Sequence, residues 1–447
     1  MHLGETESLC PVCLAKIAAK RTVFENNVVL EKRCREHGSF RALLWRDAKL
    51  YEEWGSGEDA PGSEARFSTS NMGCPHDCGL CPEHKGETCT ALMEVTHRCD
   101  INCPVCFASS EKNLREPSIE TVKEMYQTVL EAGGPYPVQL SGGEPTIRDD
   151  LADIVAMGKK MGFYHIQLNT HGIRLAREKE YLQRLKDSGL DLVYLQFDGV
   201  SDDVYRFTRG ANLFDHKLQA IQNCLDLKVG VALVPTLIPG INDHQIGDIV
   251  RFAKKWIPIV KSIHFQPVSY FGRYPKAPDD QDRATIPDVL RALEVQTEGE
   301  IRASNFVPRR RKDSHCGFSG FFVLTKENTL KATVDFPQRK AYERDSDQFG
   351  PSPAEHVRTF IDRRCRFVEK DTGCCKGKEG SWAEFFERAD SHYLSISGMP
   401  FQDVWTIDLE RLRGCCIHVV SPSRRLIPFC SYYLTSISGR RLHEDKF

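Results

Sequence analysis

The chain has 447 residues, 40% of them hydrophobic, and a formal net charge of −2 at pH 7. This length exceeds one ordinary core and predicts two or three domains. The near-neutral charge gives no global basis for binding nucleic acid, and no run of eighteen apolar residues predicts a transmembrane helix. The N-terminal MHLGETESLC lacks the charged and then apolar layout of a signal peptide, so we expect a cytoplasmic protein.

Cysteine is the unusual residue of this composition, with eighteen in the chain. Ten lie at or before Cys106, and six more lie between Cys365 and Cys430. Disulfide frameworks are typical of small secreted domains, which this chain does not resemble. Thiolates at C-x2-C or C-x3-C spacing converge instead on zinc or an iron–sulfur cluster, so we expect metal ligation. Cys224, alone on a helical pattern, is expected to be a small buried hydrophobic residue.

Residues 1–70 are predicted to form a first unit around a mononuclear metal. Two ligand pairs at knuckle spacing flank residues 22–34, which alternate like a strand or hairpin. Such an arrangement supplies four tetrahedral ligands, for zinc or a rubredoxin-like iron. The predicted ligands are Cys10, Cys13, Cys34 and His37. The Gly-, Ser- and Pro-containing acidic stretch at 55–68 is predicted to be a linker.

Residues 71–91 hold a second cysteine group without hydrophobic periodicity, so we expect a loop. Cys74, Cys78 and Cys81 have C-x3-C-x2-C spacing, and Cys89 follows them. We predict an auxiliary iron–sulfur cluster here, with Cys89 as a candidate fourth ligand.

Residues 92–275 alternate regularly between strand and helix patterns. Strands are predicted at 92–96, 138–141, 166–169, 192–197, 229–237 and 263–268. Amphipathic helices are predicted near 118–132, 150–162, 176–188, 214–227 and 243–257. Short strands joined by helices imply right-handed βαβ units and a parallel sheet. The predicted fold class is therefore α/β, a partial (β/α)6 barrel with its site at the carboxyl ends of the strands.

A third cysteine group, Cys99, Cys103 and Cys106, directly follows the first of these strands. A site that cleaves S-adenosylmethionine (SAM) reductively needs three thiolates on a loop at the top of a barrel strand, holding a [4Fe–4S] cluster with one open iron. The preceding strand, the following helix and Phe107, an aromatic placed to pack against adenine, distinguish this triplet from the one at 74–81. We therefore assign the catalytic cluster to 99–106.

Polar groups at later strand ends are candidates for SAM contacts. At the second strand, exposed peptide groups of the glycine-rich turn can bind the amino group of SAM, although a simple βα turn explains the same residues. At the third and fourth strands, side chains are placed for ribose or methionine contacts, and an arginine beyond can pair with the SAM carboxylate. These candidates are Gly142, Gly143, Glu144, Asn169, Gln196, Asp198 and Arg209.

Residues 276–447 lose this regularity and are predicted to form a cysteine-rich C-terminal domain for an auxiliary cluster and the substrate. The basic run 309–312 is predicted to be a solvated loop, with phosphate contact as the alternative. Cys374 and Cys375 are ambiguous, since adjacent cysteines seldom both reach one metal.

The triplet with its trailing aromatic, the Gly-Gly-Glu-Pro turn at 142–145 and the Gln196-x-Asp198 pair resemble the radical SAM superfamily. The tandem triplets, the N-terminal CPVC…CREH site and the C-terminal GCCIHVVSPSRRLIPFC segment make the chain similar to one subfamily. That subfamily contains the class D radical methylases and the archaeal tetraether lipid synthase. The resemblance implies several [4Fe–4S] clusters and a mononuclear metal, with a second auxiliary cluster held by Cys415, Cys416 and Cys430 together with Cys316.

The resemblance implies C–C bond formation at an unactivated C–H bond, driven by a 5′-deoxyadenosyl radical. One version is methyl transfer to a pterin-like substrate, and the alternative is radical coupling of lipid alkyl chains. No cobalamin-binding domain is evident in the sequence. An alternative of another class is an iron–sulfur or zinc protein for electron transfer or interaction. If the chain is an enzyme of this kind, it needs a reductant such as ferredoxin or flavodoxin and a small-molecule or lipid substrate.

Overall fold

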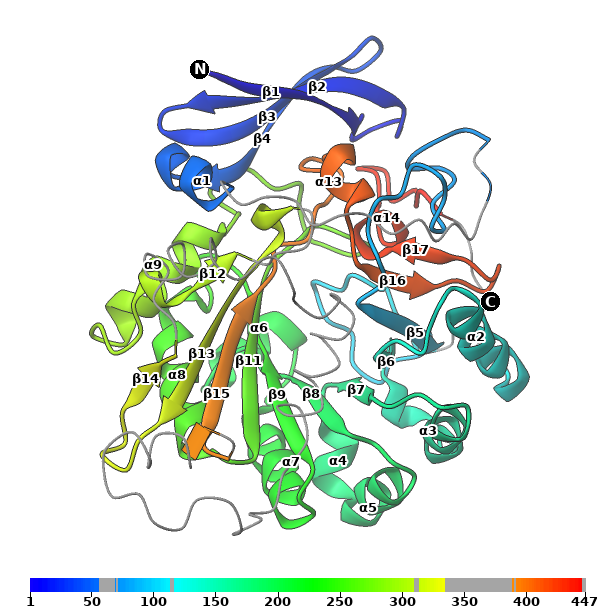
Figure 1. The fold of residues 1–447 in the computed structure, drawn as a ribbon, viewed down its shortest axis with the longest axis vertical. Coiled ribbons are helices and arrows are strands. Elements are labelled where there is room, and N and C mark those ends of the chain that lie inside the picture. Colours follow the sequence, from blue (N-terminus) through cyan, green and yellow to red (C-terminus); the bar gives the residue numbers. More distant parts are fainter. Residues whose placement is uncertain are drawn as a thin grey trace, which may run out of the picture.

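In the computed structural model, the described residues are 1–55, 69, 71–112, 116–308, 313–333, 388–389 and 391–443. The basic run 309–312 and three of the cysteines, Cys365, Cys374 and Cys375, lie outside them. Figure 1 shows an N-terminal sheet set above a larger sheet that helices cover on one side.

The N-terminal unit is an antiparallel sheet of four strands in chain order. Its strands are β1 (His2–Leu9), β2 (Lys16–Phe24), β3 (Asn27–Cys34) and β4 (Gly38–Arg46). The predicted hairpin at 22–34 is present as the β2–β3 turn, where Phe24 pairs with Asn27. Helix α1 (Ala48–Trp54) follows, and the side chain of Asp47 caps it by accepting from the Leu50 N–H at 3.1 Å.

Six parallel strands form the centre of the larger sheet, in the order β5-β6-β7-β8-β9-β11. Their bounds are β5 (Thr90–Thr96), β6 (Val138–Gly142), β7 (Ile166–Thr170), β8 (Leu192–Gln196), β9 (Gly230–Val234) and β11 (Val260–Pro267). A short strand, β10 (Thr236–Leu237), pairs with β11. All six predicted strands are present, and the α/β prediction of a partial (β/α)6 barrel is confirmed.

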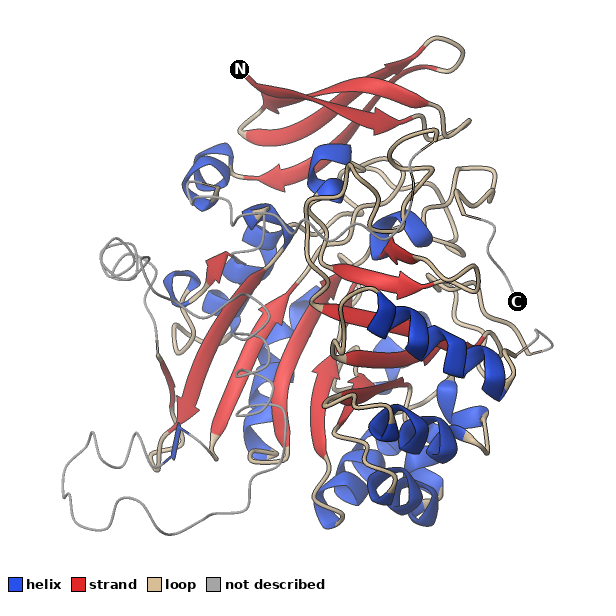
Figure 2. Cartoon of the chain, turned by 45° about the vertical axis from the view of Figure 1, so that its right-hand side comes forward, coloured by secondary structure: helices blue, strands red, loops and turns tan. Residues whose placement is uncertain are grey.

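Amphipathic helices cover the outer face of these strands (Figure 2). They are α2 (Ile119–Glu131), α3 (Leu151–Lys160), α4 (Ile173–Arg177), α5 (Lys179–Asp187), α6 (Asp202–Arg209), α7 (Phe214–Asp226) and α8 (Ile246–Lys255). In α2, Ser118 caps the first turn, and the buried stripe includes Val122, Met125 and Val129. The sequence did not predict the short helices α4 and α6, which follow the ends of β7 and β8.

C-terminal strands extend this sheet at both edges, so the described strands beyond residue 276 belong to the same sheet as the barrel strands. Beyond β11 lie β15 (Tyr393–Gly398), β13 (Phe318–Leu324), β12 (Val307–Pro308) and β14 (Leu330–Ala332); beyond β5 lie β16 (Ile417–Val420) and β17 (Leu426–Pro428). The helices here are α9 (Ile286–Gln296), α13 (Leu409–Arg413) and α14 (Phe429–Tyr432). Among the described residues β12 and β17 do not pair, so the barrel stays open.

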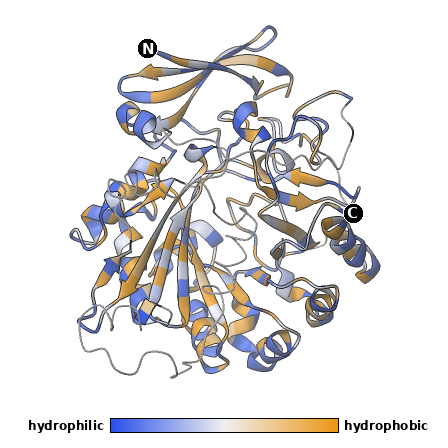
Figure 3. Ribbon diagram, in the orientation of Figure 1, coloured by the Kyte–Doolittle hydropathy of each residue, from blue (hydrophilic) through white to orange (hydrophobic). Residues whose placement is uncertain are grey.

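The two faces of the central strands differ in polarity. Alternate residues such as Leu140, Leu168 and Leu195 belong to the main hydrophobic core under the helices. Because side chains alternate along a strand, the residues between them occupy the inner face. They include Gln139, Gln167, Asn169, Gln196 and Gln266. Figure 3 shows hydrophobic residues along the central strands. None of the described helices is long and apolar enough to cross a bilayer.

Candidate active site

The loop that carries Cys99, Cys103 and Cys106 follows β5 and is fixed by backbone hydrogen bonds. The Cys99 N–H donates to the carbonyl of Glu111 at 3.2 Å, and Cys106 exchanges two backbone hydrogen bonds with Arg273 at 2.9 and 3.0 Å. The Arg273 side chain also donates to the Cys103 carbonyl at 2.9 Å. Arg273, which follows β11 in the chain, therefore holds the loop. The loop thus extends from the end of β5 to the segment that follows β11.

The three thiols of this loop do not converge on a single ion. Among the described residues, the groups whose ligand atoms all lie within 4.8 Å of one another do not include this triplet. Wider separation suits a cluster of several irons, whose ligands reach different metal atoms. Cys103 is buried, and burial raises the pKa of the Cys99 thiol. Burial thus disfavours the thiolate form of this cysteine, and a bound iron would offset that cost by binding the thiolate.

Asp198 and Arg209, each predicted as a SAM contact, form a pair with one another. Arg209 donates from Nε to Asp198 Oδ2 at 2.6 Å and from Nη2 to Oδ1 at 3.0 Å. The guanidinium fork that we expected for the SAM carboxylate is thus engaged with Asp198, because α6 ends beside the end of β8. Nη1 of Arg209 lies 3.8 Å from Cys103 Sγ, so the pair borders the cysteine loop.

The Gly142-Gly143-Glu144 turn packs against the cysteine loop, which changes the role we expected for it. The Gly143 and Glu144 N–H groups donate to the carbonyls of Thr96 and Arg98 at 2.8 Å, so they do not point to a ligand. A Cβ on either glycine would lie 2.0 Å from one of these carbonyl oxygens. Glycine is therefore required by close backbone approach.

Glu144 is buried, and both of its carboxylate oxygens are in use. Oε1 accepts from the hydroxyls of Thr146 and Thr170, each at 2.6 Å, and Oε2 accepts from the His171 N–H at 2.8 Å. We expected this side chain to contact SAM, but it instead ties the ends of β6 and β7 together.

Asn169 and Gln196, predicted to contact SAM, lie on the inner face of the sheet. Asn169 donates from Nδ2 to Gln139 Oε1 at 3.2 Å. Gln196 accepts on Oε1 from Nζ of Lys217 at 2.9 Å. Sequence analysis missed Lys217, although a lysine among Ala220, Ile221 and Cys224 on the buried face of α7 is a recognisable signal. A charged side chain at such a position is rarely fully buried without a specific partner.

Phe107 is 37% exposed and packs against the C-terminal helix α14. Its ring centroid lies 4.8 Å from that of Tyr433 and 5.8 Å from that of Phe429. Tyr432 and Tyr433 also donate to the buried carboxylate of Glu94 on β5, at 3.0 and 2.7 Å. The C-terminal segment therefore closes over the inner side of β5 beside the cysteine loop.

The 74–81 loop lies against the same C-terminal helix. Cys74 and Cys78 share a thiol hydrogen bond that lowers the pKa of Cys74 and raises that of Cys78. Cys78 Sγ also accepts from the Ser431 hydroxyl at 3.4 Å. Cys81 is buried, and burial raises its pKa. The loop is thus adjacent to Cys430, far along the chain.

Cys89, expected beside Cys74, Cys78 and Cys81, has a different neighbour. It directly precedes β5, which runs parallel to β16, and its N–H donates to the carbonyl of Cys416 at 2.7 Å. Their Sγ atoms lie 2.7 Å apart. This register places Cys89 with the C-terminal cysteines.

The C-terminal cysteines predicted from the resemblance gather around Cys415. Burial, and then the charges of Cys430, Cys416 and Cys316, raise its pKa, which shows that these groups are near one another. Nε of Arg411 donates to Cys316 Sγ at 2.9 Å. A guanidinium beside this half-buried thiol suits a site that holds thiolate.

The four predicted ligands of the N-terminal unit meet at one point. All four ligand atoms of Cys10, Cys13, Cys34 and His37 lie within 4.8 Å of one another. Cys13 Sγ and Cys34 Sγ are 4.0 Å apart, and His37 Nδ1 lies 3.7 and 3.5 Å from the Sγ atoms of Cys10 and Cys34. Metal–sulfur bonds of about 2.3 Å in a tetrahedron give ligand separations of about 3.8 Å. The geometry fits one zinc or iron ion.

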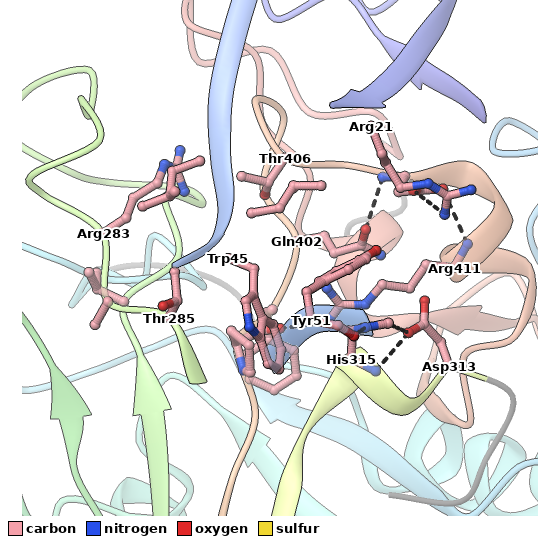
Figure 4. A pocket seen from close by; sticks show the side chains of 17 residues that line it. Arg21, Trp45, Tyr51, Arg283, Thr285, Asp313, His315, Gln402, Thr406 and Arg411 are labelled. Carbon is pink, nitrogen blue, oxygen red and sulfur yellow. Dashed lines mark hydrogen bonds and ion pairs between the residues drawn. The ribbon is translucent and has the colours of Figure 1, made fainter. Parts of the chain in front are cut away.

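A cavity of about 60 Å³ lies between the N-terminal unit and the C-terminal residues, and Val268, which directly follows β11, is among its lining residues. Figure 4 shows Trp45, Tyr51 and His315 grouped at its lower side, and Tyr51 stacks on His315 with centroids 3.8 Å apart. Arg21 and Asp408, which both line the cavity, pair at 3.2 Å, and Arg283 pairs with Asp403 at 2.8 Å. The cavity thus lies where the N-terminal unit meets the C-terminal residues, outside the cysteine-loop site.

Comparisons with known proteins agree with this geometry. Residues 93–253 match the model of the radical SAM superfamily, and residues 2–46 match the HMPTM N-terminal zinc ribbon domain. The chain is 36% identical to the 7,8-dihydro-6-hydroxymethylpterin dimethyltransferase of Methanocaldococcus jannaschii, over 99% of this chain and 95% of that protein.

More distant relatives match a smaller share of the chain. The Fe-coproporphyrin III synthase of Methanosarcina barkeri is 25% identical over 80% of this chain and 82% of that protein. The crystal structure of Streptococcus suis SuiB with its precursor peptide SuiA matches with a TM-score of 0.41 and 12% identity, over 65% of this chain and 69% of that one. The chain is a radical SAM enzyme, and it belongs to the family of the 7,8-dihydro-6-hydroxymethylpterin dimethyltransferase.

Proposed function

We propose that this enzyme transfers methyl groups to a small, polar, pterin-like heterocycle. The observation that carries the proposal is a group of amide side chains on the inner face of the sheet, on β6 and β7. Gln167 donates to Asn169 at 3.4 Å, and Asn169 donates to Gln139 at 3.2 Å. Amides offer both donors and acceptors, which suit the edge of a heterocycle better than an alkyl chain. The full-length relative named for a pterin substrate supports the same class.

Within this proposal, Cys99, Cys103 and Cys106 hold the [4Fe–4S] cluster that binds SAM, and SAM reduction there supplies a radical able to attack an unactivated C–H bond. The described residues fit such a group, because three thiols stand on an anchored loop with a guanidinium 3.8 Å from Cys103 Sγ. Arg273 and the Gly142–Gly143 turn fix the loop. Arg209, Asp198 and Gln196 form its polar border.

The remaining cysteines would hold further metals. We assign Cys74, Cys78 and Cys81 to one auxiliary cluster. A second cluster takes up to four cysteine ligands, which we assign to the group formed by Cys89, Cys316, Cys415, Cys416 and Cys430. The four ligands of the N-terminal unit are assigned to zinc. Radical SAM enzymes require an electron donor, and we propose a ferredoxin or flavodoxin for this role. Extensive thiol ligation suits a reducing compartment, which supports a cytoplasmic location.

Product analysis after anaerobic reconstitution tests this proposal. The holoenzyme would be incubated with dithionite, SAM, a reduced-folate one-carbon donor and 7,8-dihydro-6-hydroxymethylpterin, and the pterin fraction analysed by mass spectrometry. We expect a product carrying one or two added methyl groups. Unchanged pterin, together with coupled products in a parallel incubation that contains dialkyl lipids in place of the pterin, would instead identify a lipid-coupling enzyme.

A matched pair of variants links the product to the inner face. Asn169→Leu removes an amide from that face and is expected to raise the KM for the pterin. Asn223→Leu removes a buried amide that binds the carbonyl of Leu175 behind the sheet at 2.7 Å, and should leave that KM unchanged. Equal pterin KM values in the two variants would contradict the proposed location.

A further inference from the structure

Arg411, on the short helix α13, holds its guanidinium against the C-terminal cysteine group. Its Nε donates to Cys316 Sγ at 2.9 Å, and its Nη2 donates to the carbonyl of Pro400 at 2.8 Å. The arginine is half-buried. Because a guanidinium is planar and rigid, two contacts from different nitrogens fix its orientation as well as its position.

The charge of Arg411 is not balanced by a carboxylate. A guanidinium is always charged in proteins, yet none of the described carboxylates forms an ion pair with this one. The carboxylate of Asp313, three residues before Cys316, instead accepts from the His315 N–H at 2.8 Å (Figure 4). The sulfur of Cys316 is therefore the group that balances this charge once the cysteine binds iron as a thiolate. A hydrogen bond from a charged donor to an ionised acceptor is about twice as strong as one between neutral groups.

The segment that holds Arg411 also supplies a donor to a second cysteine of the group. The Gln402 N–H, two residues beyond Pro400, donates to Cys430 Sγ at 3.3 Å. Cys316 and Cys430 come from distant parts of the chain, and each accepts from a nitrogen of this one region. Hydrogen bonds to cysteine sulfurs and nearby positive charge both affect the reduction potential of an iron–sulfur cluster.

The other two cysteine groups have weaker donors among the described residues. Cys103 Sγ lies 3.8 Å from Nη1 of Arg209, and Cys78 Sγ accepts from the neutral hydroxyl of Ser431 at 3.4 Å. The contact of Arg411 is shorter than the first of these and, unlike the second, carries a charge. Because reduction adds a negative charge to a cluster, such a donor favours the reduced state and raises the reduction potential.

We propose that Arg411 is a positioning residue for the second auxiliary cluster, whose reduction potential it raises through the charged hydrogen bond to Cys316. A cluster of raised potential suits the acceptance of an electron, whereas cleavage of SAM requires a strongly reducing cluster. This inference rests on the proposed assignment of a second auxiliary cluster, with Cys316 among its ligands.

A potentiometric titration of the anaerobically reconstituted holoenzyme, followed by electron paramagnetic resonance, tests the inference. Cys316→Ser identifies the reduction step of the second auxiliary cluster, because it alters or removes that step alone. In Arg411→Met the same step should move to lower potential, with the equilibrium constant for reduction about tenfold smaller, which is about 59 mV for a one-electron couple. The other steps should stay at their wild-type potentials.

Arg21→Met is a matched control. Arg21 lines the same cavity as Arg411, but it pairs with Asp408 and Glu410, at 3.2 and 2.7 Å, instead of a cysteine. Its loss should lower the melting temperature and leave every reduction step at the wild-type potential. Equal shifts in Arg21→Met and Arg411→Met would mean that the contact with Cys316 has no specific role, which would overturn the inference.

Arg411→Lys tests the role of the charge. Lysine keeps the positive charge but lacks the planar group that reaches Cys316 and Pro400 together, so the potential should lie between those of the wild type and Arg411→Met. Iron analysis checks that each variant retains its clusters. If Arg411→Met loses the cluster, Arg411→Lys decides the question, since a wild-type potential in that variant would overturn the inference.

An unshifted step in Arg411→Met, or a shift in a step other than the one that Cys316→Ser alters, would overturn this inference and leave the proposed function intact. Absence of methylated pterin from the wild-type holoenzyme would instead overturn the proposed function, whatever the potentials of the clusters.

Discussion

The carboxylate of Asp198 and the guanidinium of Arg209 form a two-point ion pair, with nitrogen–oxygen distances of 2.6 and 3.0 Å, at the border of the catalytic cysteine loop. Asp198 is fully buried. Burial alone would raise the pKa of its carboxyl, but Arg209 more than compensates and holds the pKa below its ordinary value. Both members of the pair are therefore charged, and Arg209 also contacts the Cys103 thiol of the loop.

Asp198→Asn should strongly impair SAM cleavage. Removing one partner of a buried ion pair leaves an uncompensated charge, which costs about 3–5 kcal/mol. We expect a lower melting temperature and at least about a tenfold loss of 5′-deoxyadenosine formation, a loss equivalent to 1.4 kcal/mol. Arg424→Lys is the control, since Arg424 binds Glu131 at two points (2.8 and 2.6 Å) on the surface. Normal activity in Asp198→Asn would contradict a role for the pair.

Gly142→Ala should displace the cysteine loop and lower the iron content of the reconstituted protein. Gly142 has φ +119°, and a Cβ there would lie 2.0 Å from the Thr96 carbonyl oxygen. Gly162→Ala separates this clash from backbone strain, because Gly162 has φ +95° and open space around it. Iron analysis and circular dichroism compare the two variants, and equal iron contents would show that the turn does not support the loop.

Sequence patterns located the parallel sheet and the cysteine loop, because strand alternation and short ligand spacings are local properties. They did not show how the strand-end groups are used. Glu144, Asp198 and Arg209 were predicted as SAM contacts, and the structure adds that each also bonds to another part of the protein. Such pairings join residues from different strands and helices, so spacing along the chain does not reveal them.

Spacing along the chain also does not fully reveal which cysteines lie together. The four ribbon ligands are held together by one local sheet, and their grouping was predicted. Cys89 was placed with the 74–81 loop because it is near in sequence. The parallel pairing of β5 with β16 brings it to Cys416 instead. Likewise, the extension of the barrel sheet by β13 and β15 depends on pairings between residues far apart in the chain.

Cys34→Ser should remove one equivalent of metal from the N-terminal site. The hydrogen bond with His37 lowers the pKa of the Cys34 thiol to about 6, which favours the thiolate form that binds a metal. Because protons compete with the metal for its ligands, metal analysis of the wild type should show loss of this ion as the pH is lowered. Cys224→Ala, at a buried cysteine with burial-raised pKa, should retain full metal content. An unchanged metal content in Cys34→Ser would contradict the four-ligand site.

Lys217 should make the stability of the protein depend on pH. Burial lowers the pKa of its amine to about 7, against 10.5 for the free group. Between these values the unfolded chain binds more protons, so the free energy of unfolding contributed by this group rises as pH increases from about 7 and is constant below that. Melting temperatures at pH 7 and 9 should therefore differ less in Lys217→Met than in wild type. If the melting temperatures of Lys217→Met and wild type changed equally with pH, the lowered pKa of Lys217 would be contradicted.

The central claim is that Cys99, Cys103 and Cys106, rather than Cys74, Cys78 and Cys81, form the site of SAM cleavage. The most direct measurement is 5′-deoxyadenosine release by the anaerobically reconstituted enzyme with dithionite, compared between Cys99→Ala and Cys74→Ala. We predict that Cys99→Ala abolishes the product and that Cys74→Ala retains it. Product from Cys99→Ala together with none from Cys74→Ala would contradict the assignment, and no product from wild type would contradict the account as a whole.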